Sequence, residues 1–326
     1  MSDKKIRVGV VGVGDFGRNH VRVFHELPGA ELVGIHDADP ERARQIAAEF
    51  GTQAFSEIGQ LAEQIDAASV AVPTVLHARI SSELLQSGVD VLVEKPIASS
   101  RAEADGLIAT AKNAGRILQV GHLERFNPAV VAVQKIVTRP LFFEVHRLGV
   151  FSPRSLDVDV VFDVMIHDLD ILLWLVNSAV RDIHSVGIPV LTEKVDIAHA
   201  RIEFESGAVA NLTASRVSTE RVRKLRFFQA REYVSVDYTR QDVTRIRVTG
   251  EGSEPAIDFE KLPTQPEEPL KAELRAFLSA VRERTAPLVD GEAGRRALDL
   301  ADRVMAGILE HARRVKPELA TAPHTR

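Results

Sequence analysis

Residues 8–17, with the sequence VGVVGVGDFG, constrain the fold of this chain more than any other segment. The apolar first half is typical of a buried strand, and it runs into a glycine turn that opens a helical pattern. In the spacing G-x-G-x-x-G the first glycine permits a tight turn, the second lets backbone approach a pyrophosphate, and the third lets helix and strand pack closely. The alternative is a purely structural strand-turn-helix, so the context has to decide. The residues predicted to contact a dinucleotide here are Gly12, Gly14, Asp15, Phe16 and Gly17.

The context is a second strand, residues 31–36, which ends in Asp37, twenty residues after Gly17. A carboxylate at this position accepts hydrogen bonds from the adenosine ribose and repels a 2'-phosphate. It therefore predicts NAD as the cofactor in preference to NADP. Asp37 would otherwise be a loop carboxylate that caps the next helix, but Asp39 with Pro40 already supplies an N-cap and a first-turn proline.

Short apolar strands alternate with helical patterns from residue 6 to about residue 121, which predicts a parallel sheet covered on both faces. Ser100 and Glu103 form a capping box for a helix that Gly115 ends. The sequence thus predicts a Rossmann domain over residues 1–123. The further strands expected in it are residues 53–55, 67–72, 90–94 and 117–120.

Beyond Pro128 the pattern changes to one strand at 141–147, a helix at 160–176 and then a series of extended segments. Such a series predicts an open, mainly antiparallel sheet, and hence an α+β domain over residues 124–326 beside the α/β Rossmann domain. One crossover helix and the terminal helices, at 270–284 and 292–315, leave part of this sheet uncovered. An open apolar face predicts a homodimer or homotetramer. The extended segments are 181–190, 198–205, 209–217, 224–229, 233–237 and 244–248.

The overall composition excludes several classes of function. With 41 basic and 46 acidic residues the formal charge is -5, which does not suit a nucleic-acid binder. No stretch has the length and apolarity of a membrane span, and no apolar signal segment precedes the first strand. The absence of cysteine excludes disulfides and thiolate chemistry and fits a reducing compartment, so a cytoplasmic location is expected.

Two further strand ends carry candidate site residues. The strand at 90–94 ends in Glu94-Lys95-Pro96, and ligands of open parallel sheets bind at the carboxyl ends of strands. Pro96 restricts the backbone of Lys95, which distinguishes this lysine from an ordinary surface lysine. After the strand at 67–72 come Pro73 and Thr74, which could flank a cofactor, and His77, which could reach its ribose. The alternative for this segment is a helix start with Thr74 as its cap.

The helix expected at 160–176 places Asp163 and His167 on one face, four residues apart. A carboxylate beside an imidazole is a common general acid/base device. Two other interpretations are a histidine held by Asp163 for structure alone, and a metal site with Asp168 and Asp170. The metal interpretation is disfavoured, because no H-E-x-x-H arrangement and no third ligand at a recognisable spacing accompany them.

The G-V-G-D-F-G of residues 12–17, the E-K-P of residues 94–96 and the pair Asp163 and His167 together resemble the glucose-fructose oxidoreductase, inositol dehydrogenase and rhizopine-catabolism (GFO/IDH/MocA) family. The resemblance covers nearly the whole chain. It implies an NAD-dependent dehydrogenase in which Lys95, Asp163 and His167 surround the reacting alcohol, and in which Glu94 and Lys95 lie beside the cofactor. It also implies a C-terminal sheet whose exposed face forms subunit interfaces.

Residues 121–128 and 154–170 resemble the branch of this family that oxidises the 3-hydroxyl of UDP-N-acetylglucosamine. The resemblance implies a nucleotide-sugar substrate. Arg125, Asn127 and Arg154 are polar side chains suited to such a ligand, because the planar guanidinium fork matches phosphate oxygens. Their alternative roles are surface solvation or a local ion pair. Other substrates of the family, inositol or a free sugar, stay open, as does a tightly held cofactor or a non-enzymatic NAD-binding sensor.

Overall fold

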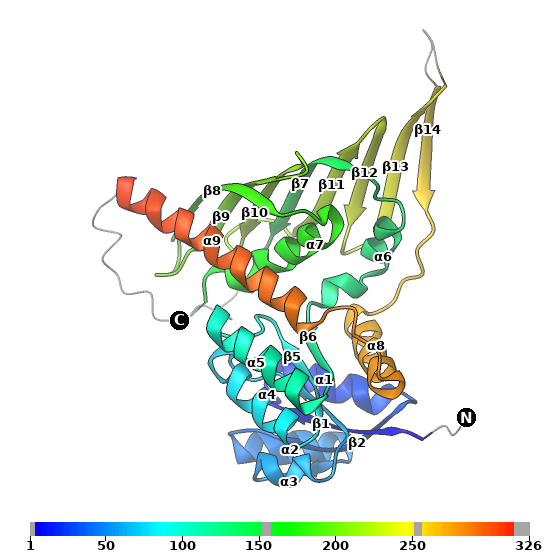
Figure 1. Ribbon diagram of the computed structural model, residues 1–326, viewed down its shortest axis with the longest axis vertical. Helices are drawn as coiled ribbons and strands as arrows, with labels where there is room; N and C mark the ends of the chain where they lie inside the picture. The colour runs from blue at the N-terminus through cyan, green and yellow to red at the C-terminus, as the bar shows by residue number, and fades with distance from the viewer. Residues whose placement is uncertain (1–3, 152–157, 251–255, 316–326) are drawn as a thin grey trace. The chain divides into compact units, whose positions relative to one another are not determined.

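The computed structural model describes residues 4–151, 158–250 and 256–315 and is shown in Figure 1. It divides into two compact units, residues 1–126 with 268–298, and residues 127–267 with 299–326. We describe each unit by itself.

The first unit is built on a six-stranded sheet in the order β3-β2-β1-β4-β5-β6, with every neighbouring pair parallel. The strand order reverses direction between β1 and β4. In doubly wound folds the ligand crevice lies at such a switch point, outside the carboxyl ends of the strands. The strands are β1 Ile6–Val11, β2 Ala30–His36, β3 Gln53–Ala54, β4 Ala67–Val70, β5 Asp90–Glu94 and β6 Leu118–Gly121.

The helices between these strands begin and end where the local sequence predicts. The carboxylate of Asp39 accepts hydrogen bonds from the backbone N–H of Glu41 and Arg42, and Pro40 occupies the first turn. Ser100 Oγ accepts a hydrogen bond from the Glu103 N–H, and Gly115 ends the helix with a left-handed φ of 63°. The predicted caps are therefore confirmed. The helices are α1 Asp15–Glu26, α2 Pro40–Phe50, α3 Ile58–Ala62, α4 His77–Gln86 and α5 Arg101–Ala114.

Helix α8, Pro269–Glu283, differs from the predicted domain boundary, because it belongs to the first unit. Its residues Leu270, Leu274 and Phe277 pack into the same core cluster as Val8 of β1 and Phe24 of α1. The first part of α9, Gly291–Val315, also lies in this unit. An amphipathic stripe shows that a helix covers a core, but it does not show which of two cores, and so the sequence placed residues 268–298 in the second domain.

The second unit is built on an eight-stranded sheet in the order β14-β13-β12-β11-β7-β10-β9-β8. All neighbours are antiparallel except β7 and β10, which confirms the mainly antiparallel prediction. The edge strand β14 was missed by the sequence analysis, and four of its seven residues are exposed. The strands are β7 Pro140–Leu148, β8 Val180–Ile188, β9 Ile197–Phe204, β10 Val209–Ser215, β11 Val222–Gln229, β12 Glu232–Asp237, β13 Asp242–Thr249 and β14 Ala256–Leu262.

Helices α6, Pro128–Gln134, and α7, Ile166–Val176, complete this unit together with the end of α9. The α9 backbone approaches the sheet closely, because Ser185 Oγ on β8 donates a hydrogen bond to the Val304 carbonyl at 2.8 Å. Throughout the described ranges, no helix combines the length and apolarity that crossing a membrane would require.

Candidate active site

Each of the three glycines after β1 has a different structural role. Gly12 has φ +85°, and a Cβ there would lie 2.6 Å from the Ala71 carbonyl oxygen. A Cβ on Gly17 would lie 1.9 Å from the Gly12 carbonyl oxygen, so this glycine lets α1 pack on the loop. A Cβ on Gly14 would meet nothing within 4 Å, and no side chain caps the α1 N-terminus there. The loop thus keeps open the side on which a pyrophosphate would meet the helix N–H groups.

Asp37 lies at the carboxyl end of β2 and is bonded to this loop. One carboxylate oxygen accepts a hydrogen bond from the Val13 N–H at 2.7 Å. The other accepts from the Asp39 N–H at 2.9 Å and from Arg42 Nη1 at 3.3 Å. The carboxylate therefore orders the glycine turn in addition to the ribose contact predicted for it, a second role that only the structure reveals.

The segment after β4 contains Pro73, Thr74 and His77, which were predicted to lie near the cofactor. Pro73 is exposed and Thr74 is partly exposed in the turn Thr74–Leu76, but Thr74 makes no side-chain cap, so that alternative is wrong. His77 is buried, with Nε2 2.9 Å from the Val72 carbonyl and Nδ1 2.7 Å from the Pro96 carbonyl. Burial lowers the pKa of His77, although both carbonyls oppose this. The ring is turned inward and joins the segments that follow β4 and β5, and its contact with a ribose stays a prediction.

Glu94 is likewise turned into the interior. It is buried, and its Oε1 lies 3.2 Å from Nε2 of the buried His20, whose Nδ1 lies 2.7 Å from Ser69 Oγ. The Lys95 N–H donates to Glu94 Oε2 at 3.3 Å. The carboxylate thus bonds the backbone at the partly exposed Lys95, and contact of Glu94 with the cofactor stays a prediction.

His20, Ser69 and Gly121 are site-supporting residues that sequence reasoning missed. A Cβ on Gly121 would lie 2.5 Å from Glu94 Oε1, so only glycine leaves room for the carboxylate. The three residues come from α1, β4 and β6, and no local motif links them. They become visible as a group only when the parallel sheet brings these elements together.

In the second unit, the predicted helix at 160–176 begins with a π-helical turn, Val161–Met165, before α7. The Ile166 N–H donates to the Val161 carbonyl, five residues back. Asp163 lies in the π turn, His167 lies in the first turn of α7, and both are half-buried. Turns of this kind are rare in proteins as a whole, and those that occur are often found at functional sites. The local geometry around the two residues thus differs from that of a uniform α-helix.

The neighbouring Asp168 fixes α7 on the sheet. It forms a two-pronged ion pair with Arg147 of β7, at 2.7 Å from Nε and 2.8 Å from Nη2. The Arg147 guanidinium also lies 4.8 Å from the Tyr238 ring centroid. Within the described residues, no three side chains of His, Asp or Glu gather as a metal site would need. The charge of Asp168 therefore has a structural partner, and this pair sets the rotation of the helix that carries His167.

The three residues predicted to contact a nucleotide sugar differ in their surroundings. Asn127 is buried and caps α6, with Oδ1 accepting from the Ala129 N–H at 3.1 Å and Nδ2 donating to the Tyr238 carbonyl at 3.1 Å. The amide therefore supports the fold, and a contact with substrate stays a prediction. Arg125 is buried in the turn Leu123–Phe126, which packs on α8, and diphosphate binding by it stays a prediction. Arg154 lies outside the described residues.

The glycine loop, the Asp37 contact and the switch-point sheet define the first unit as an NAD-binding Rossmann domain of an oxidoreductase. Residues 6–122 match the family model described as "Oxidoreductase family, NAD-binding Rossmann fold", and residues 143–251 match the "GFO/IDH/MocA C-terminal domain". The chain belongs to the GFO/IDH/MocA family of oxidoreductases, and NAD is its cofactor.

Relatives in this family include a UDP-N-acetylglucosamine 3-dehydrogenase from Acidithiobacillus ferrooxidans, 37% identical over 93% of this chain and 97% of that protein. The solved structure of that enzyme superposes with a TM-score of 0.88 over 93% of this chain and 98% of its own. An inositol 2-dehydrogenase from Rubrobacter xylanophilus is 32% identical over 57% of this chain and 56% of that protein. A levoglucosan dehydrogenase solved with NADH and levoglucosan shares the fold, with a TM-score of 0.85 at 18% identity over 94% of this chain and 98% of its own.

The contacts of Asp37 lead to a prediction about cofactor choice. We expect Asp37→Asn to lower the ratio of NAD to NADP affinity by about tenfold, equivalent to about 1.4 kcal/mol. The amide removes the charge that repels a 2'-phosphate and releases Arg42 toward it. Titration calorimetry with both cofactors measures the ratio. Asp39→Asn is the matched control, because it removes a charge from the same turn while keeping the α2 cap, and an unchanged ratio in Asp37→Asn would contradict the assignment.

Proposed function

We propose that this enzyme oxidises the 3-hydroxyl of UDP-N-acetylglucosamine to a ketone with NAD. The observation that carries the proposal is the 37% identity to an enzyme of that name along 93% of the chain. The match to the inositol 2-dehydrogenase spans only 57% of the chain. Inositol oxidation is therefore the second candidate. A non-enzymatic NAD sensor is disfavoured, because Lys95, Asp163 and His167 are all present.

Each of these three residues has a proposed role at the reacting alcohol. His167 takes the hydroxyl proton, and Asp163 orients the imidazole and balances its charge. Lys95 donates a hydrogen bond to the same oxygen and stabilises negative charge that develops on it. Lys95 and His167 can exchange the two roles. NAD, when bound, accepts the hydride from the carbon.

The residues of the first unit prepare Lys95 for this role. Glu94 accepts from the Lys95 N–H, and His20 Nε2 lies 3.2 Å from the Glu94 carboxylate on the side of α1. His77 bonds the Pro96 carbonyl, on the other side of the lysine. The lysine backbone is thereby supported on both sides by buried polar groups, which limits how far its ammonium group can stray.

The substrate proposal is tested by incubating the purified protein with NAD and three candidate sugars. UDP-N-acetylglucosamine should be oxidised, whereas free N-acetylglucosamine and myo-inositol should react poorly. Both lack the diphosphate, so they would leave polar groups of the site unpaired. Reduction of the product with borodeuteride, followed by mass spectrometry, locates the oxidised carbon. Deuterium absent from C3, together with fast turnover of inositol or a free hexose, would favour the second candidate.

We also propose that a second copy of the chain covers the open face of the C-terminal sheet. A row of apolar side chains runs in register across five neighbouring strands on this face, and two of them, Phe228 and Phe259, are 36% and 69% exposed. Neighbouring rings of the row are in tilted contact, with centroid distances of 5.8 Å for Phe142 and Phe228 and 5.2 Å for Phe228 and Tyr233. The row consists of Phe142, Phe228, Tyr233, Ile246 and Phe259.

This face leads to a prediction about assembly. The wild-type protein should be a dimer or tetramer in light scattering at micromolar concentration, and Phe228→Lys with Phe259→Lys should shift it toward monomer. Burying two lysine charges in an apolar interface costs more free energy than the remaining side chains of the row contribute to association. Leu288→Lys, an exposed apolar position of the first unit, is the control. A strictly monomeric wild type would refute the use of this face.

A further inference from the structure

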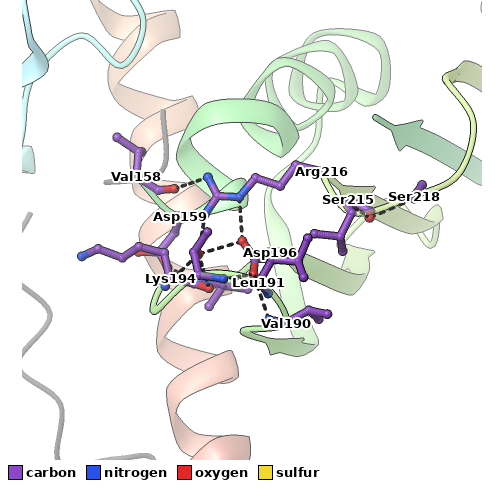
Figure 2. Close-up of polar contacts among 12 residues, drawn as sticks. Val158, Asp159, Val190, Leu191, Lys194, Asp196, Ser215, Arg216 and Ser218 are labelled. Carbon is purple, nitrogen blue, oxygen red and sulfur yellow. Dashed lines mark hydrogen bonds and ion pairs between the residues drawn. The ribbon is translucent and has the colours of Figure 1, made fainter. Parts of the chain in front are cut away.

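A buried ion pair joins the end of β10 to the start of β9 in the second unit (Figure 2). Arg216 directly follows β10 and Asp196 directly precedes β9, with Nε and Oδ1 2.8 Å apart. The two side chains are 9% and 0% exposed. The Arg216 N–H also donates to the Asp196 carbonyl at 3.0 Å, so backbone and side chains join the same two residues. Neither residue belongs to the motifs that mark the active site.

The carboxylate of Asp196 organises the loop that enters β9. Its Oδ2 accepts three successive backbone N–H bonds, from Val190 at 2.8 Å, Leu191 at 2.7 Å and Thr192 at 2.8 Å. Its Oδ1 accepts from Thr192 Oγ1 at 2.8 Å as well as from Arg216. Burial raises the pKa of Asp196, but these donors outweigh burial and hold the pKa well below its usual value. The carboxylate stays ionised and keeps the loop in one conformation.

This loop in turn holds the chain just before the π turn. The Val195 N–H donates to Asp159 Oδ1 at 2.8 Å, and the Val195 carbonyl accepts from the Val160 N–H at 2.9 Å. Arg216 Nη1 donates to the Val158 carbonyl at 2.7 Å. Three consecutive residues, 158–160, are therefore bonded to Arg216 or to the loop that Asp196 orders, as the dashed lines of Figure 2 show in part.

The anchored residues set the position of Asp163. The Asp159 carbonyl accepts hydrogen bonds from the N–H groups of Phe162 and Asp163, each at 3.1 Å. The side chain of Asp159 is thus bonded to the loop, and its carbonyl is bonded to the π turn. The connection runs from Arg216 and Asp196 through residues 158–160 to the backbone of Asp163, by way of hydrogen bonds and directly adjacent residues.

We propose that Arg216 and Asp196 are positioning residues of the reaction, which fix the π turn so that Asp163 meets His167 in the productive geometry. The inference rests on the roles proposed above for Asp163 and His167. A guanidinium suits the task, because its planar fork bonds Asp196 with one nitrogen and Val158 with another. An ammonium group at the end of a flexible chain offers no such fixed pair of directions.

Arg216→Gln tests the proposal. We expect kcat to fall about 10- to 100-fold, because a misplacement of about 1 Å at a reacting group costs about 100-fold. NAD affinity should not change, since the glycine loop belongs to the other unit. Amide hydrogen exchange, followed by mass spectrometry on peptides covering residues 158–165, should become faster, while peptides from β11 and β12 keep their protection.

Two further variants keep the test decisive. Arg216→Lys retains the charge beside Asp196 but loses the fork, so it should fold, with kcat reduced and exchange at 158–165 raised. It serves in place of Arg216→Gln if that variant does not fold. Arg245→Gln is the matched control, because it removes an arginine from an ion pair with Glu232 in the same unit and should leave kcat and exchange at 158–165 unchanged.

The outcomes separate this inference from the proposed function. Wild-type kcat in Arg216→Lys or Arg216→Gln, with or without a lower melting temperature, would overturn the positioning role. Unchanged exchange over residues 158–165 would overturn it as well. Asp163→Asn is measured in parallel: if it keeps full turnover, the proposed role of Asp163 fails, whereas loss of turnover in Asp163→Asn with none in the Arg216 variants refutes the inference alone.

Discussion

Replacement of His167 by alanine is expected to lower kcat by about 10²- to 10⁴-fold, the contribution of a positioned general acid or base. Lys95→Ala should fall in the same range, because it removes the group that stabilises negative charge on the reacting oxygen. Initial rates with the true substrate measure both losses. Both variants should fold normally, since neither side chain is fully buried.

The controls for this prediction separate catalysis from binding and from fold. NAD affinity should change little in the His167 variant, because the glycine loop and Asp37 are untouched. His184→Ala, at an exposed position on β8 where the imidazole pairs only with Asp182 among the ion pairs described, should keep wild-type turnover. If His167→Ala retained most of its turnover, the assignment of the base would be wrong, and Lys95 would be the remaining candidate.

The second large effect concerns stability. Arg147→Met is expected to lower the free energy of unfolding by about 3–5 kcal/mol, because it leaves the carboxylate of Asp168 buried without its partner. The two side chains are only 6% and 2% exposed, so water cannot replace the guanidinium. Stacking of Arg147 on the Tyr238 ring is lost in the same substitution. Chemical denaturation, monitored by the fluorescence of Trp174 on α7, measures the change.

Two comparisons show whether burial is the cause. The double variant Arg147→Met with Asp168→Leu should recover most of the loss, since an apolar pair has no unmet charge. Arg314→Met breaks an ion pair with Glu310 whose side chains are 70% and 67% exposed, and it should cost about 0–1 kcal/mol. A loss below about 1 kcal/mol in Arg147→Met would mean that the buried pair does not hold α7 on the sheet.

Turnover of Arg147→Met is informative in its own right. Asp168 follows His167 directly, and successive residues of an α-helix point about 100° apart. The pair with Arg147 therefore sets the direction in which the His167 ring leaves the helix. We expect kcat of the folded variant to fall, because α7 loses the contact that fixes its rotation.

The features that sequence alone determined are those in which a residue answers a local demand. Gly12 must adopt a positive φ, and Gly17 must lack a Cβ because the Gly12 carbonyl lies against it. Both demands arise within the few residues of the turn itself. Asp39 and Ser100 bond N–H groups two or three residues away. The alternation of short apolar strands with amphipathic helices likewise follows from periodicities of a few residues. Such demands can be read from neighbouring letters, and the Rossmann domain was predicted from them.

The tertiary structure decided the features whose partners lie far apart in the chain. Glu94 meets His20 of α1, Arg147 meets Asp168, and Arg216 meets both Asp196 and Val158. Each pair is buried, so each polar group needs a partner, but nothing in the sequence says which of many candidates will be brought to it. For that reason the sequence analysis did not predict that Glu94 bonds the backbone of Lys95.

The same reason explains α8, β14 and the π turn. An amphipathic helix, a half-exposed edge strand and one extra residue in a helical turn each satisfy their local rules in more than one arrangement. The packing of Leu274 and Phe277 in the first core, the pairing of β14 with β13, and the anchoring of residues 158–160 select one arrangement. Sequence predicted which residues carry the chemistry, and only long-range packing and buried polar contacts decided how those residues are held.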